Sequence, residues 1–132
     1  SWELTPNSED GLNALVKLLN DNPNITIEMA AHTDMIGNNS ANQELSHKRA
    51  QSVVNYLINN GIEKERLTPV GYGEEKPVVV DEVLHKQYTF LPKDQVLDEA
   101  FITTLPADQQ EVCNSLNRRT EFRVLKTTYN LY

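Results

Sequence analysis

The run Ile25-Thr26-Ile27-Glu28-Met29, in which apolar and polar side chains alternate, constrains the fold of this chain more than any other feature. Such alternation is the period of a β-strand that has one face on a core. Apolar residues at helical spacing precede this strand at residues 12–19 and follow it at residues 45–58. A strand between two amphipathic helices predicts an α/β fold.

Three further elements follow along the chain. Residues 66–70 form a short strand candidate, and its Pro69 is typical of a sheet edge or a bulge. A helix is expected at about residues 107–116, and residues 120–126 alternate again, which predicts the last strand. The order helix, strand, helix, strand, insertion, strand predicts an α/β sandwich with helices packed on one face of a mixed sheet.

Length and composition narrow the function classes. A chain of 132 residues, 39% of them hydrophobic, predicts one globular domain. The net charge of -7 and pI near 4.9 exclude nucleic acid as the main partner, because binding to a phosphate backbone needs a basic face. The single Cys113 cannot form an internal disulfide, and we expect it to be a small buried side chain. No apolar run is long enough for a membrane span, and the first residues lack the pattern of a signal peptide.

Polar residues cluster where the first strand ends and the second helix begins. Asp34 ends the strand, and a side chain at a strand end is held rigidly yet remains open to solvent. Helical spacing is expected to place four residues on one face of the helix, Asn42, Leu45, Ser46 and Arg49. An acid and a base from two elements would then face a ligand. The alternative interpretation is that Asp34 caps the loop and Arg49 is a solvated helix residue.

Other kinds of site have weaker support. His32, Asp34 and His47 lack the paired spacing of metal ligands, so we expect no metal site. No Gly-x-Ser-x-Gly elbow is present, and we expect no catalytic residues. Gly71-Tyr72-Gly73 lacks the third glycine of a phosphate cradle and predicts a tight turn. The Asn117-Arg118-Arg119 segment is either a basic patch for an acidic partner or a structural element before the last strand.

Residues spread over nearly the whole chain match the pattern of one known family. They are Leu4, Asn22-Pro23, His32-Thr33-Asp34, Gly37, Asn42, Leu45-Ser46, Arg49-Ala50, Gly61-Ile62, Arg66, Gly71-Tyr72-Gly73-Glu74, Pro77, and Asn117-Arg118-Arg119 with Glu121. In this order they resemble the OmpA-like peptidoglycan-binding domain of bacterial envelope proteins. The long connection before Asn117 is similar to the variety found in Bacteroidetes outer-membrane proteins.

The resemblance implies a domain organisation. Residues 1–132 would form a single OmpA-like domain, with residues 1–77 and 117–128 as the family core and residues 78–116 as an insertion before the last strand. The implied fold is a mixed sheet with helices on one face, in βαβαβ-type order. The family has a further strand upstream of the first helix, and since the chain starts at Ser1, we expect most of that strand to be missing.

The resemblance also implies a ligand and a site. Asp34 and Arg49 would bind diaminopimelate, the third residue of the peptidoglycan stem peptide, whose free end carries an ammonium and a carboxylate. A carboxylate and a guanidinium held a few ångström apart can bind both charges. The residues at the family's other pocket-lining positions are Thr33, Asn42, Leu45 and Arg118. No cofactor is implied.

The implied function is noncatalytic binding of peptidoglycan, which anchors the outer membrane or an envelope protein to the cell wall. We expect the domain in the periplasm, within an outer-membrane-associated protein that forms either monomers or homodimers. The alternative is an envelope protein interaction or dimerisation domain that uses residues 78–116 as its contact surface. Under the first function, Cys113 and residues 78–116 are expected to be peripheral to the ligand.

Overall fold

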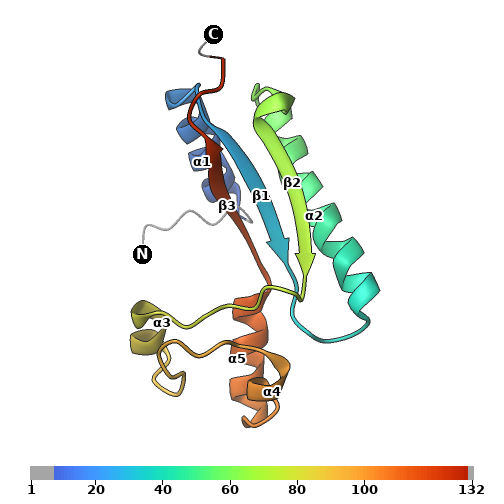
Figure 1. The fold of residues 1–132 in the computed structure, drawn as a ribbon, viewed down its shortest axis with the longest axis vertical. Coiled ribbons are helices and arrows are strands. Elements are labelled where there is room, and N and C mark those ends of the chain that lie inside the picture. The colour runs from blue at the N-terminus through green and yellow to red at the C-terminus, as the bar shows by residue number, and fades with distance from the viewer. Residues whose placement is uncertain (1–7, 131–132) are drawn as a thin grey trace.

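A computed structural model describes residues 8–130, in which helices and strands alternate before a helical segment and a final strand (Figure 1). The elements are α1 (Glu9–Asp21), β1 (Thr26–His32), α2 (Asn39–Asn59), the 3-10 turn η1 (Lys64–Arg66), β2 (Leu67–Gly73), α3 (Glu82–Gln87), α4 (Glu99–Ile102), α5 (Ala107–Asn117) and β3 (Arg119–Lys126). The expectation of a truncated first strand falls on residues 1–7 and lies outside the described residues.

The strands of the described chain form one mixed sheet in the order β2-β1-β3. β2 runs parallel to the central β1, and β3 runs antiparallel to it. The connection between the two parallel strands is α2, as a parallel crossover requires. Pro69 lies in β2, at the edge of this sheet, where its missing N–H leaves no bond unmade inside the sheet. The predicted mixed sheet is confirmed.

One face of the sheet is covered by α1 and α2, and the main core lies between these layers (Figure 1). Ile27 and Met29 of β1 are fully buried against the two helices. Their helix partners in this core include Leu15, Leu19, Val54 and Leu57. The alternation seen at residues 25–29 therefore does place one face of β1 on the core.

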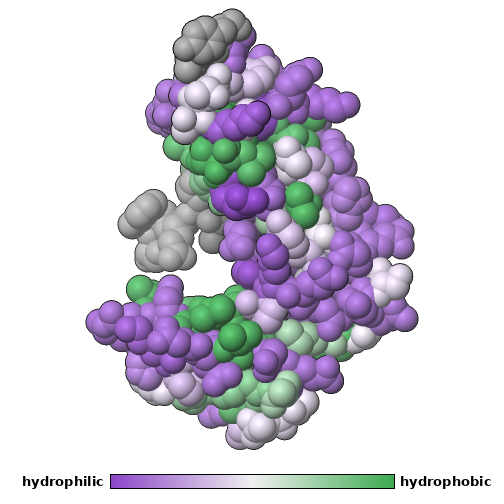
Figure 2. Space-filling model, viewed as in Figure 1, coloured by the Kyte–Doolittle hydropathy of each residue, from purple (hydrophilic) through white to green (hydrophobic). Residues whose placement is uncertain are grey.

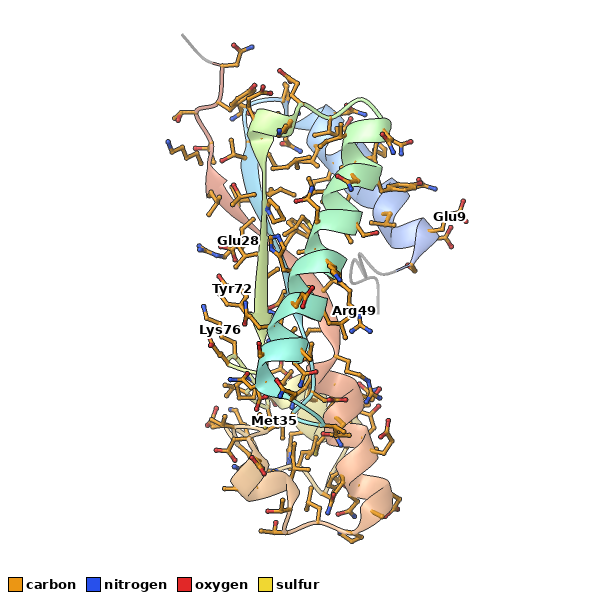
Figure 3. The ribbon with its side chains drawn as sticks, turned by 90° about the vertical axis from the view of Figure 1, so that its right-hand side faces the viewer. Glu9, Glu28, Met35, Arg49, Tyr72 and Lys76 are labelled. Atoms are coloured by element: carbon orange, nitrogen blue, oxygen red, sulfur yellow. The ribbon has the colours of Figure 1, made fainter. Side chains whose placement is uncertain are left out.

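The other face of the sheet carries paired charges. Glu28 accepts a hydrogen bond from the Tyr72 hydroxyl (2.9 Å) and is paired with Arg123 (Nη2 to Oε2, 3.1 Å). The His32 ring stacks on Tyr72, with ring centroids 5.3 Å apart. Figure 3 shows Glu28, Tyr72 and Lys76 on the side of the sheet away from α2. This face is thus occupied by interactions among its own side chains.

Arg66 fixes the end of α1 against the sheet. Its side chain is buried and donates hydrogen bonds to three backbone carbonyls, those of Leu19 (2.9 Å), Asn22 (2.7 Å) and Ile25 (3.0 Å). The carbonyls at a helix C-terminus have no partner within the helix and carry partial negative charge, which a guanidinium satisfies. Arg66 therefore joins α1, the turn after it and the start of β1.

Residues 78–116, called the 78–116 segment below, contain a second hydrophobic cluster. Its buried members are Val80, Leu91, Leu97, Ile102 and Cys113. Asn117, the last residue of α5, ties two distant parts of the segment together: its Oδ1 accepts from the N–H of Val78 (2.9 Å), and its Nδ2 donates to the carbonyl of Leu97 (3.0 Å). Cys113 is buried, as expected, and burial raises the pKa of its thiol. The description of this segment as an insertion stays a prediction.

Candidate functional site

The site is built on a loop that follows β1 and is pinned at both ends. The N–H of Thr33 donates to the carbonyl of Gly73 (2.9 Å), and its hydroxyl donates to the carbonyl of Asp34 (2.9 Å). At the other end, the Oδ1 of Asn38 accepts from the N–H of Ala41 (3.1 Å) and caps α2. The short loop between these bonds has little freedom to move.

Asp34 is the central residue of this loop. Its Oδ1 accepts a hydrogen bond from the N–H of Ile36 (3.0 Å), and its Oδ2 accepts one from Nη1 of Arg118 (2.6 Å). Asn42, in the first turns of α2, donates to the carbonyls of Ile36 (3.0 Å) and Asp34 (3.4 Å). Asp34 does shape the loop, as the alternative interpretation proposed, yet its carboxylate also meets a cation from the far end of the chain.

The N-terminal half of α2 divides into a buried and an exposed stripe. Asn42 and Ser46 are buried, whereas Leu45 is 41% exposed and Arg49 is exposed. The four residues expected on one face of α2 therefore span the edge of its buried surface, with Asn42 and Ser46 on the buried side and Leu45 and Arg49 on the exposed side. The buried stripe runs from Asn42 through Ser46, Ala50 and Val54 to Leu57, and its first two members are polar.

Close packing of α2 on β2 explains why polar residues are buried there. The Ser46 Oγ accepts from the N–H of Gly73 (2.9 Å) and donates to the carbonyl of Gln43 (2.8 Å). A Cβ on Gly71 would lie 2.6 Å from both the Cα of His47 and the Oγ of Ser46, so only glycine fits. Gly71 and Gly73 thus belong to a strand that approaches a helix, and the expected tight turn begins only after them.

Arg118 connects the loop to the 78–116 segment. Beside its bond to Asp34, its Nη2 donates to Oε1 of Glu111 on α5 at 2.5 Å. Both carboxylates, Glu111 first, raise the pKa of the Arg118 guanidinium. Glu111 was not predicted, and through it residues 78–116 contact Arg118, one of the predicted site residues. The spacing of 111 and 118, two turns apart at a helix end, is the only signal of this pair in the sequence.

Arg49 is an unpaired cation on the exposed stripe of α2. Among residues 8–130 it has no ion pair and no side-chain hydrogen bond. Figure 3 shows it on α2, on the opposite side of the sheet from Tyr72 and Lys76. Asp34 and Arg49 are therefore not in contact with each other: the cation bound to Asp34 is Arg118. Within the described part of the chain, no bond to the guanidinium of Arg49 has to break before it binds an anion.

Metal and membrane features are not found in the described part of the chain. Residues 8–130 contain no cluster of three His, Cys, Asp or Glu side chains suited to a metal ion. No helix among them has the length and apolarity needed to cross a membrane.

Comparison with known proteins identifies the family. The sequence model of the OmpA family matches residues 1–88, which include Asp34, Arg49 and both strands of the parallel pair. The chain belongs to the OmpA family. The match ends before α5, so Glu111 and Arg118 lie outside the matched region.

Two outer-membrane proteins are similar in sequence to this OmpA-family chain. Outer membrane porin F of Pseudomonas fluorescens is 41% identical over 73 residues, which are 55% of this chain and 22% of that protein. Outer membrane protein A of Salmonella typhi is 40% identical over 77 residues, 57% of this chain and 22% of that protein. The chain thus spans about a fifth of the length of these outer-membrane relatives.

The fold is similar to that of the peptidoglycan-associated lipoprotein from Burkholderia pseudomallei, seen in a crystal structure. The TM-score is 0.60 at 23% sequence identity, and the likeness covers 88% of this chain and 75% of that one. This confirms the predicted fold class, a mixed sheet with helices on one face.

Proposed function

We propose that this domain binds peptidoglycan without catalysis, through the diaminopimelate residue of the stem peptide, and so anchors an outer-membrane protein to the cell wall in the periplasm. Membership of the OmpA family supports this function. So does the fold shared with a lipoprotein that is named for its association with peptidoglycan. The proposal needs no cofactor and no metal.

Two observations carry the proposal: the loop before α2 holds a carboxylate, and α2 carries a guanidinium that has no partner among the described residues. Asp34 lies on a loop pinned by backbone bonds, and its partly occupied oxygens keep lone pairs for an ammonium group. Arg49 has no partner among the described residues, so its planar fork is available to a carboxylate. The free end of diaminopimelate carries both of these groups.

Four further residues complete the proposed site. Thr33 and Asn42 hold the loop by the bonds described above and offer polar groups to the peptide. Leu45 would supply an apolar contact, which its exposure permits. Arg118 is the second cation beside Asp34.

The test is calorimetric titration of the domain with a stem peptide that contains diaminopimelate, beside the same peptide with lysine at the third position. Lysine keeps the ammonium but lacks the carboxylate. Because Arg49 is exposed, the lost charge-assisted bonds are worth about 2 kcal/mol, or roughly 30-fold in affinity. Equal affinity for the two peptides would show that the assignment to diaminopimelate is wrong.

The exposed apolar side chains of the 78–116 segment support an alternative function, self-association. Val79, Val83 and Val96 are 56%, 64% and 37% exposed. Figure 2 shows apolar surface in the region of α3 and α5. We propose self-association through this surface as the alternative. Sedimentation equilibrium tests it: a mass that stays monomeric at high protein concentration excludes the homodimer.

A further inference from the structure

Both terminal nitrogens of the Arg118 guanidinium donate hydrogen bonds to carboxylates, and the two carboxylates come from different parts of the chain. Nη1 donates to Oδ2 of Asp34 at 2.6 Å, and Nη2 donates to Oε1 of Glu111 at 2.5 Å. The Asp34 side chain is 12% exposed and that of Glu111 is 62% exposed. One of the two acids is therefore enclosed in the site, and the other approaches from the surface of α5.

The first consequence concerns charge. Asp34 and Arg118 alone are neutral as a pair, and a neutral pair attracts an ammonium group only weakly. With Glu111 included, the three side chains carry one net negative charge. Glu111 thus compensates the cation, so that the charge of Asp34 is left over for a ligand.

The second consequence concerns geometry. A free arginine prefers to bind a carboxylate with two parallel hydrogen bonds, which would use both oxygens of Asp34. Here Arg118 meets Asp34 through a single nitrogen, because its second nitrogen is held by Glu111. Glu111 therefore prevents Arg118 from closing over the carboxylate that the ligand needs.

We infer that Glu111 is a positioning residue of the Asp34 site: by holding and neutralising Arg118, it keeps Asp34 available to the ammonium group of the ligand. This inference rests on the proposed function of the site. It also gives the 78–116 segment a part in binding, since α5 supplies the carboxylate that adjusts the affinity.

The experiment compares Glu111→Gln with the parent chain by calorimetric titration with the diaminopimelate stem peptide. Gln keeps the size and one acceptor but removes the charge. Since Glu111 is largely exposed, we expect a loss of affinity of about three- to fivefold. The matched control is Asp108→Asn, which removes one acidic charge from the same helix and from the same surface hollow without touching Arg118. Its affinity is expected to match that of the parent.

A second ligand separates positioning from a general structural effect. Acetylating the side-chain amine of diaminopimelate removes the ammonium and leaves the carboxylate in place. Glu111→Gln should weaken the free-amine peptide only, so parent and variant should bind the acetylated peptide equally. A merely structural role would weaken both peptides alike.

The outcomes distinguish this inference from the function on which it rests. If the parent binds the stem peptide and Glu111→Gln binds it equally well or more tightly, the role of Glu111 is refuted while the proposed function stands. An equal loss for both peptides also refutes it. If the parent binds neither peptide, the proposed function fails and the role of Glu111 fails with it.

Discussion

Replacing Arg49 by glutamine isolates the cation that is proposed to bind the ligand carboxylate. Arg49 is exposed and has no partner among residues 8–130, and arginine and glutamine have similar helix propensities. The free energy of unfolding should therefore change by less than about 0.5 kcal/mol. Any large change in binding would then belong to the site and not to folding.

The size of the binding effect follows from the bonds that are lost. The guanidinium can donate two charge-assisted hydrogen bonds to a carboxylate, whereas the amide donates one neutral bond. With Arg49 exposed to water, the difference is about 2 kcal/mol, or roughly 30-fold in the affinity for the diaminopimelate stem peptide. The lysine peptide lacks this carboxylate, so its affinity should be unchanged. The variant should thus lose the discrimination between the two peptides.

Calorimetric titration with both peptides measures these affinities, and thermal unfolding checks the fold. Lys48→Gln is the matched control, because it removes one positive charge from the neighbouring exposed position of α2, where Lys48 pairs with Glu44 at 3.2 Å. A similar loss in this control would mean that only the net charge of the helix matters. If Arg49→Gln keeps the parent's preference for diaminopimelate, the role assigned to Arg49 is refuted.

Three predictions concern the scaffold beneath the site. Arg66→Met leaves three backbone carbonyls without their donor and should lower the free energy of unfolding by about 3 kcal/mol, measured by urea denaturation; a change below 1 kcal/mol contradicts it (~0.5 is typical of surface sites). Gly71→Ala drives a Cβ into the backbone of His47 and should cost roughly 1–3 kcal/mol, and an unchanged thermal midpoint would refute this packing. Burial alone would raise the pKa of Glu28, but the hydrogen bonds from Arg123 and Tyr72 lower it below the ordinary 4.5. The stabilising effect of Glu28 is therefore present above the unfolded pKa and is lost as the pH falls through the folded pKa. The variant Glu28→Gln should accordingly show a smaller loss of stability below about pH 5 than the parent. A loss equal to that of the parent would contradict this role of Glu28.

The elements that were predicted correctly are those with a local signal. Alternation marked β1 and β3. The cap of α1 is a signal equally local in the sequence, since the Oγ of Ser8 accepts from the N–H of Gly11 at 3.0 Å. Gly61 follows α2 with a φ of +93°, as a residue in the left-handed position should. Each of these signals involves residues a few positions apart, so one sequence is enough to detect it.

The parts that were missed depend on contacts between distant segments. Nothing local in the sequence separates the exposed Leu45 from the buried Ser46, because the surface of α2 that packs on β2 is fixed by Gly71 and Ser46. Asp34 was predicted as a ligand-binding acid, but nothing local indicates that it pairs with a residue 84 positions away. The family resemblance named Arg118 as a second cation without predicting that Glu111 would hold it. Long-range charge pairs of this kind become visible only when the fold brings their elements together.

The register at His32 has a consequence for how such chains diversify. Gly73 at the end of β2 and Arg119 at the start of β3 both pair with His32, on its two sides. The chain leaves the sheet at the end of β2 and returns to it at the start of β3, and these two points are about two strand spacings, or about 10 Å, apart. Three or four extended residues can span this distance. The pairing of the strands would therefore also allow a connection between β2 and β3 that is much shorter than the present one. Evolution can exchange one stretch of sequence at this place for another of different size, and each exchange gives the loop of Asp34 new neighbours while the sheet beneath it is inherited unchanged.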